Sequence, residues 1–102
     1  MNPHDRRIRE SPLFQGEDEE IVYCLTTTPW GSTPTNVSVV VKDVDGTDVT
    51  SSVTSGISAV SGDVISTPTI QDLTANTEYR LEIRFTVSGN VMEAWAIIDT
   101  QE

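Results

Sequence analysis

The stretch Tyr79-Arg80-Leu81-Glu82-Ile83-Arg84-Phe85-Thr86-Val87 decides the fold of this chain, because its odd positions are apolar and its even positions are polar. Such alternation is typical of a β-strand with one buried face and one solvated face. Ser88-Gly89-Asn90 follows as a turn, and residues 91–99 are predicted to return as a second strand. A two-residue turn, either Ser88-Gly89 or Gly89-Asn90, places the second strand's even positions on the buried face, whereas a three-residue loop with a bulge reverses its faces.

Trp95 and Ile97 point away from the core in the two-residue register, with Arg84 across the strand pair. Two interpretations stay open for this group. It is either a local cluster in which Arg84 stacks on Trp95, or a protein-binding face, since Trp and Arg are enriched in interface hot spots. Trp30 lies in a loop rich in proline and glycine, where it either caps one end of the fold or marks a second contact site.

The composition also favours strands, because 12 Val, 8 Ile and 14 Thr make 34 β-branched residues out of 102. No run of about 18 apolar residues is present, so we expect no membrane-spanning helix. Residues 1–10 show no secretory signal, and the single cysteine cannot form an internal disulfide. Sixteen acidic and six basic residues give a net charge of -10, which argues against nucleic-acid binding. We therefore expect a cytoplasmic protein.

Two regions are predicted along the chain. Residues 1–20 are a flexible polar and acidic arm with few large apolar side chains, and residues 21–102 are a β-domain. The arm is either a solvated tail or a segment that docks on a partner through Ile8, Leu13 and Phe14. Within the domain, Val37, Val39 and Val41 alternate as a half-buried strand, and Asp45-Gly46 predicts a tight turn with a short strand over residues 47–50. About seven short strands indicate an antiparallel sandwich.

The stretch Leu73-Thr74-Ala75-Asn76-Thr77-Glu78-Tyr79-Arg80-Leu81-Glu82-Ile83 resembles the turn-and-strand signature of fibronectin type III and related immunoglobulin-like domains. The resemblance implies an all-β, antiparallel immunoglobulin-like β-sandwich. It also implies that Leu73 and Tyr79 form a tyrosine corner, with the Tyr79 ring in the core and its hydroxyl bonded to nearby backbone. The chain departs from the family at Ala75, where proline is common, and in having a single cysteine.

A second resemblance covers shorter pieces. Thr28-Pro29-Trp30-Gly31, Asp48-Val49-Thr50, Ser61-Gly62-Asp63-Val64-Ile65 and Ser88-Gly89-Asn90-Val91 are similar to small uncharacterised proteins among tailed-phage and prophage structural genes. That resemblance implies a structural or accessory role, with a virion-associated location as the alternative to a cytoplasmic one, and it brings no catalytic residues with it.

The sequence contains little that suggests chemistry. His4 is the one histidine and lies in the polar arm, and Cys24 is predicted to be a buried, inert thiol. Asp43, Asp45 and Asp48 resemble a calcium loop, but Gly46 stands fourth where an EF-hand needs glycine sixth, so we expect a hairpin turn with a weak calcium site as the alternative. We expect no cofactor, no other metal site and no enzymatic activity.

These features together predict a non-enzymatic structural or protein-interaction module that is phage-related. Its expected partner is another protein or a second copy, without nucleic acid or membrane. The candidate contact residues are Trp30, Arg84, Trp95 and Ile97. The alternative is a carbohydrate-binding or adhesion module, because β-sandwiches often carry sugar sites on exposed aromatic side chains.

Overall fold

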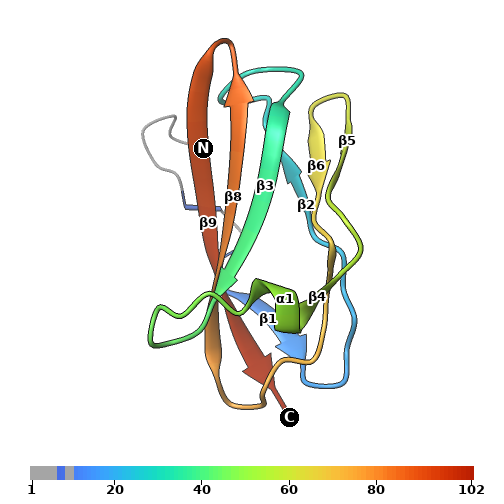
Figure 1. Cartoon of the computed structure of the whole chain (residues 1–102), viewed down its shortest axis with the longest axis vertical. Coiled ribbons are helices and arrows are strands. Elements are labelled where there is room, and N and C mark those ends of the chain that lie inside the picture. The colour runs from blue at the N-terminus through green and yellow to red at the C-terminus, as the bar shows by residue number, and fades with distance from the viewer. Residues whose placement is uncertain (1–6, 9–10) are drawn as a thin grey trace.

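The computed structural model describes residues 7–8 and 11–102, so His4 and the rest of residues 1–6 and 9–10 lie outside the described part. The described residues form one short helix and nine strands, which confirms the all-β prediction (Figure 1). In chain order these are β1 (Leu13–Gly16), β2 (Cys24–Thr26), β3 (Thr35–Lys42), α1 (Thr50–Val53), β4 (Thr54–Ser55), β5 (Ala59–Ser61), β6 (Val64–Ser66), β7 (Thr69–Ile70), β8 (Glu78–Val87) and β9 (Asn90–Gln101).

The strands form three sheets. The largest has the order β1-β9-β8-β3, the second has the order β2-β6-β5, and β4 pairs with β7 alone. Every pairing is antiparallel except that of β1 with β9. In Figure 1, β9, β8 and β3 lie together on one side, and β2, β6 and β5 lie on the other. This arrangement is compatible with a β-sandwich.

The β8–β9 hairpin has the two-residue turn. Val87 pairs with Asn90, so Ser88 and Gly89 are the central residues, with φ angles of 50° and 79°. A turn whose two central residues both have positive φ angles is a type I′ turn, and its twist matches that of the flanking strands. The register places the buried residues of β9 beside those of β8, as predicted: Leu81 with Ala96, Ile83 with Ala94, and Tyr79 with Ile98.

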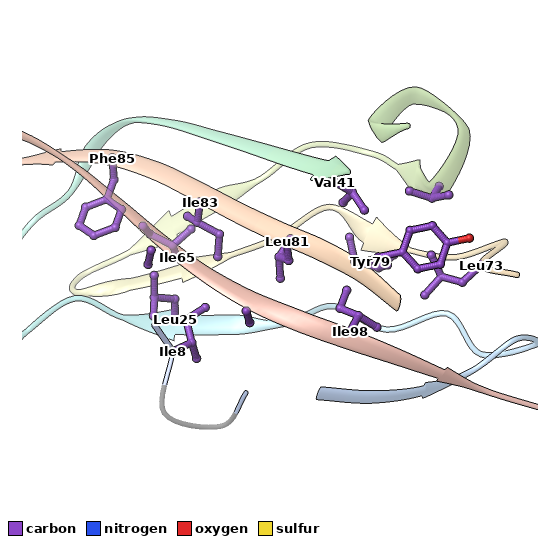
Figure 2. Close-up of a cluster of buried hydrophobic side chains, with 14 of the residues drawn as sticks. Ile8, Leu25, Val41, Ile65, Leu73, Tyr79, Leu81, Ile83, Phe85 and Ile98 are labelled. Atoms are coloured by element: carbon purple, nitrogen blue, oxygen red, sulfur yellow. The ribbon is translucent and has the colours of Figure 1, made fainter. Parts of the chain in front are cut away.

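The hydrophobic core lies between the two larger sheets. Figure 2 shows Leu81, Ile83 and Phe85 of β8 pointing toward Ile65 of β6 and Leu25 of β2. The three β8 side chains are at most 1% exposed. Burying a side chain of this size stabilises a fold by about 1.5–3 kcal/mol, so the alternating strand that predicts the fold also supplies much of its core.

The N-terminal segment packs on the domain over the residues that the structure describes, which differs from the predicted arm over residues 1–20. The Ile8 N–H donates to the Trp95 carbonyl at 2.8 Å, and β1 continues parallel to β9. Ile8 is 8% exposed and Gln15 is fully buried. The edge of β9 offers backbone hydrogen bonds, and these compensate for the low apolar content of the segment. The prediction of a flexible arm was based on apolar content alone, which does not reveal such backbone bonds.

Gln15 connects this segment to the second half of the chain. Its amide nitrogen donates to the Ile70 carbonyl at 2.8 Å and to the Glu19 carbonyl at 3.0 Å. Its amide oxygen accepts a hydrogen bond from the Tyr23 hydroxyl at 2.8 Å. Burial, and then the nearby Glu19 carboxylate, raise the pKa of Tyr23 to about 12. A polar residue at a fully buried position is tolerated here because all of its polar groups are bonded.

Two local predictions were wrong. Residues 47–50 do not form a strand: only Asp48 bridges to Lys42, and Thr50 already begins α1. The Asp48 carboxylate accepts hydrogen bonds from both the backbone and the hydroxyl of Thr50, which favours a helical turn at this point. Cys24 is exposed rather than buried, because in the three-residue β2 only the middle residue, Leu25, faces the core.

Candidate functional site

The side of the four-stranded sheet that faces away from the core is the candidate site, here called the outer sheet face. It is formed by alternate residues of the three long strands: Ser38, Val40 and Lys42 of β3, Arg80, Glu82 and Arg84 of β8, and Glu93, Trp95 and Ile97 of β9. Their neighbours in sequence point into the core, so the alternation that buries one face also assembles the other.

Trp95 lies at the centre of the outer sheet face and is half-buried. The Arg80 guanidinium lies 4.4 Å from the centroid of its ring, and the Arg7 guanidinium lies 5.8 Å from it. Both distances are within the range of cation–π attraction. Trp95 therefore points outward as predicted, and the guanidinium groups of Arg80 and Arg7 lie close to its ring.

The predicted stacking of Arg84 on Trp95 was wrong. Arg84 is directly opposite Glu93 in the register, and its guanidinium lies 3.8 Å from that carboxylate. Arg80 is opposite the uncharged Ile97, which leaves it available to lie diagonally over the indole. The charge of the direct cross-strand neighbour therefore decides which of the two arginines reaches the ring.

Glu82 holds two basic side chains together. Its carboxylate lies 3.3 Å from the Lys42 ammonium and 2.8 Å from the Arg80 Nε atom, and its side chain is 14% exposed. Glu82 is also the direct cross-strand neighbour of Trp95. The contact of the Arg80 Nε atom with Glu82 favours the position of its guanidinium over the indole.

Two hollows flank this cluster. One has a volume of about 270 Å³ and lies between the β3 end and the β8 start, with Val44, Tyr79 and Ile97 among its lining residues. The other has a volume of about 330 Å³ and is lined mostly by polar side chains, among them Asp48, Arg84 and Glu93. Lys42 lines both hollows. The outer sheet face thus has one apolar hollow, one polar hollow and a group of basic side chains.

The other predicted site residues lie elsewhere. Trp30 is half-buried and its ring centroid lies 5.8 Å from that of Phe85, so it covers the core beside β8. Gly31 follows it at a close approach, since a Cβ there would lie 2.8 Å from the Val87 Cβ atom. The capping role accounts for this position, and a contact role for Trp30 stays a prediction. Trp30 therefore does not join Trp95, Arg84 and Ile97 in one site.

Leu73 and Tyr79 adopt the arrangement that the family resemblance implies. Leu73 is 4% exposed and Tyr79 is 6% exposed. The Thr74 backbone N–H donates to the Tyr79 hydroxyl at 2.9 Å. The contact fixes the loop before β8, and so it fixes where the alternating strand begins.

The carboxylates of the candidate calcium loop are used by the chain itself. The Asp43 carboxylate accepts the N–H groups of Asp45 and Thr47 at 2.9 and 3.0 Å, and Asp48 binds Thr50. The hydrogen bonds from the Thr50 hydroxyl and backbone, and then the Lys42 charge, lower the pKa of Asp48. Among residues 7–8 and 11–102, no group of three or more His, Cys, Asp or Glu side chains is arranged to hold a metal ion.

Several residues of the outer sheet face were missed from the sequence. The even positions of β3 and β8 hold Lys42, Arg80 and Glu82, and the odd positions of these strands were assigned to the core. Because alternate residues of a strand share a face, this even numbering could have predicted that the three side chains lie together on the outer sheet face. Arg7 could not have been found in this way, because a parallel bridge to Trp95 brings it from the far end of the chain.

Comparison with known proteins gives no relative: no family model, no curated protein and no solved structure matches this chain. In the part of the chain covered by the structure, no helix is both long enough and apolar enough to cross a membrane.

Proposed function

We propose that this chain is an immunoglobulin-like, fibronectin type III-like β-sandwich that acts as a non-enzymatic protein-interaction module through its outer sheet face. One observation carries the proposal. All four basic residues in the described part of the chain, Arg7, Lys42, Arg80 and Arg84, lie on this face, in a chain of net charge -10.

The distribution of charge supports an interface at this place. The four basic side chains of the described part are gathered on this face, so the acidic surface elsewhere repels other acidic proteins. On the outer sheet face, carboxylates and cations offset each other around Trp95, with an apolar hollow beside Ile97. Trp and Arg next to a small apolar hollow are the residue types that most often anchor protein contacts.

A site-specific photocrosslinker tests the proposal in the cells that express the chain. Placed at Ile97, it should give a discrete crosslinked protein band. Ser61 provides the matched control, because it is exposed on the three-stranded sheet. The band should disappear when Arg80 and Lys42 are both replaced by glutamate. Equal crosslinking from positions 97 and 61, or none from position 97, would count against the outer sheet face.

The phage-related role is the finer part of the proposal, and it is supported by the short sequence resemblances around Thr28-Pro29-Trp30-Gly31 and Ser88-Gly89-Asn90-Val91. We propose a virion or accessory protein, in which the partner is another structural protein or a second copy. Capsid and tail genes on either side of the coding gene would support this role, and neighbouring hydrolase genes would argue against it.

The carbohydrate-binding alternative has less support. Sugar sites need an open aromatic platform, whereas Trp95 is half-buried beneath the Arg80 and Arg7 guanidinium groups, and Trp30 packs on Phe85. Phe14, at 62% exposure, is the one large exposed aromatic side chain among the described residues. A glycan array without hits would remove the alternative, and a hit lost on Phe14→Ala would revive it.

A further inference from the structure

A small cavity lies between the N-terminal segment and the core of the domain. Its volume is about 160 Å³. Its lining comes from three parts of the chain: Ile8 and Leu13 of the N-terminal segment, Tyr23, Cys24 and Leu25 in and before β2, and Leu81 and Ile83 of β8. In Figure 2, Ile8 lies beside Leu25 at the edge of the cluster of buried side chains. The cavity is therefore between the two larger sheets, on the side that the N-terminal segment closes.

Two alanines of β9 account for the space. Ala94 is directly opposite Ile83 and Ala96 is directly opposite Leu81, and both alanines are fully buried. An alanine side chain ends at its Cβ atom, so β9 contributes little volume to the core at this level. Ile8 completes the core instead, since its backbone is hydrogen-bonded to β9 beside these alanines. Ile8 fills only part of the space, and the cavity is the remainder.

The inner wall of the cavity is hydrocarbon. Leu25, Leu81 and Ile83 are at most 4% exposed, and Ile8 is 8% exposed. A water molecule needs about two to four polar partners to occupy a cavity, and these four side chains provide none. The inner part of the cavity therefore favours an apolar occupant over water.

The outer wall is more polar. The Tyr23 hydroxyl donates to the Gln15 amide oxygen at 2.8 Å, and the Cys24 thiol lies 3.6 Å from the Ser66 hydroxyl. Cys24 is exposed, so the cavity reaches the solvent beside it. Its backbone N–H and C=O also point to the free side of β2, because the neighbouring residues of the strand bond to β6. Among the described residues that line the cavity, none is charged.

We infer that this cavity is a binding site for a small apolar molecule of about the size of a benzene ring. The volume decides the size, because an engineered protein cavity of about 150 Å³ with leucine, isoleucine and phenylalanine walls stays dry and binds benzene. The lining decides the chemistry, because a charged ligand would lose its hydration without gaining a partner of opposite charge. The site does not depend on the function proposed for the outer sheet face, and its test uses different residues.

Occupation of the cavity would also hold the N-terminal segment in place. Ile8 forms one wall, and the guanidinium of its neighbour Arg7 lies 5.8 Å from the ring centroid of Trp95. A ligand that binds only when Ile8 is packed stabilises that state relative to states in which the segment is detached. The ligand should therefore favour the contact between Arg7 and Trp95, so that binding next to the core affects the outer sheet face.

Methyl NMR tests the site with benzene as the probe. When benzene is added to about 1 mM, the methyl resonances of Leu25, Leu81 and Ile83 should shift and saturate, whereas those of Val60, exposed on β5, should stay in place. Pyrimidine, a ring of the same size with two polar nitrogen atoms, is the matched control and should cause no such shifts. Shifts that do not saturate, that are equal at Val60, or that pyrimidine reproduces would overturn the inference.

A substitution that fills the cavity adds an independent test. Ile8→Phe supplies an aromatic ring to the space where benzene should bind, and Ile8→Leu keeps the side-chain volume as the matched control. The Phe variant should bind benzene at least about tenfold more weakly than the wild type, and the Leu variant should bind it equally well. A folded Ile8→Phe variant with wild-type affinity would contradict the site. Should this variant fail to fold, the titration of the wild type with benzene and pyrimidine decides alone.

Discussion

The four-stranded and the three-stranded sheets differ in length and in charge. β3, β8 and β9 have 8, 10 and 12 residues, whereas β2, β5 and β6 have three residues each. The strands of the smaller sheet contain no charged residue, while every described basic residue lies on the outer face of the larger one. The larger sheet thus provides both most of the regular pairing and the candidate interaction surface.

Side-chain hydrogen bonds add to the backbone ones where the smaller sheet ends, since the Thr67 N–H donates to the Tyr23 carbonyl and the Thr27 N–H donates to the Asp63 carbonyl. The Tyr23 N–H donates to the Thr67 hydroxyl at 3.0 Å, next to Pro68, which has no N–H for a ladder. At the other end, the Thr27 hydroxyl donates to the Gly31 carbonyl at 2.9 Å. The smaller sheet therefore closes the core with short strands that are fixed at their ends, and it should contribute less to stability than the larger sheet.

The largest expected effect is a difference between a buried position of the larger sheet and an exposed position of the smaller sheet. Leu81 of β8 is fully buried between Val41 and Ala96, so Leu81→Ala should lower the free energy of unfolding by about 2–5 kcal/mol. Val60 of β5 is 43% exposed, and Val60→Ala should cost about 1 kcal/mol or less. Urea unfolding followed by circular dichroism measures both. Equal losses would contradict the difference in burial between these two positions.

The second effect concerns the contact between the N-terminal segment and the domain. Gln15→Leu keeps the size of the side chain but leaves the Ile70 carbonyl and the Tyr23 hydroxyl without their partner, at a cost of about 1–3 kcal/mol. Phe14→Leu, at an exposed neighbouring position, should change stability by less than about 0.5 kcal/mol. Thermal unfolding compares the two. A Gln15→Leu variant as stable as wild type would mean that this segment is not held by Gln15.

The hairpin could be predicted from the sequence, whereas the contacts at its outer face could not. Strict alternation from Tyr79 to Val87 and a two-residue turn leave one register, and that register places Trp95 outward. The choice of Arg80 over Arg84 depends on which side chain stands opposite each arginine and on Glu82, so it follows from side-chain geometry rather than from the pattern. The packing of Ile8 and Gln15 depends on backbone groups of β9 and Ile70, which no local pattern describes.

The third effect is a loss of stability at high pH that comes from Tyr23. Its pKa is raised in the folded state from 10.0 to about 12, so the unfolded chain releases this proton first. The stabilisation is fully present below pH 10 and is lost as the pH rises from 10 through 12. Subtracting the unfolding free energy of Tyr23→Phe from that of wild type at each pH isolates the contribution. The difference should fall over this range, and a flat difference would contradict the raised pKa.

The smallest effect separates the two arginines of the outer sheet face. Arg80→Ala removes a guanidinium that lies 4.4 Å from the Trp95 centroid and 2.8 Å from Glu82, so it should cost about 1 kcal/mol. Arg84→Ala removes an exposed pair at 3.8 Å and should cost less than about 0.5 kcal/mol. The Trp95 indole N–H resonance distinguishes them more sharply than stability does. It should move in Arg80→Ala and stay in Arg84→Ala, because only Arg80 lies over the ring, and the reverse result would restore the contact between Arg84 and Trp95.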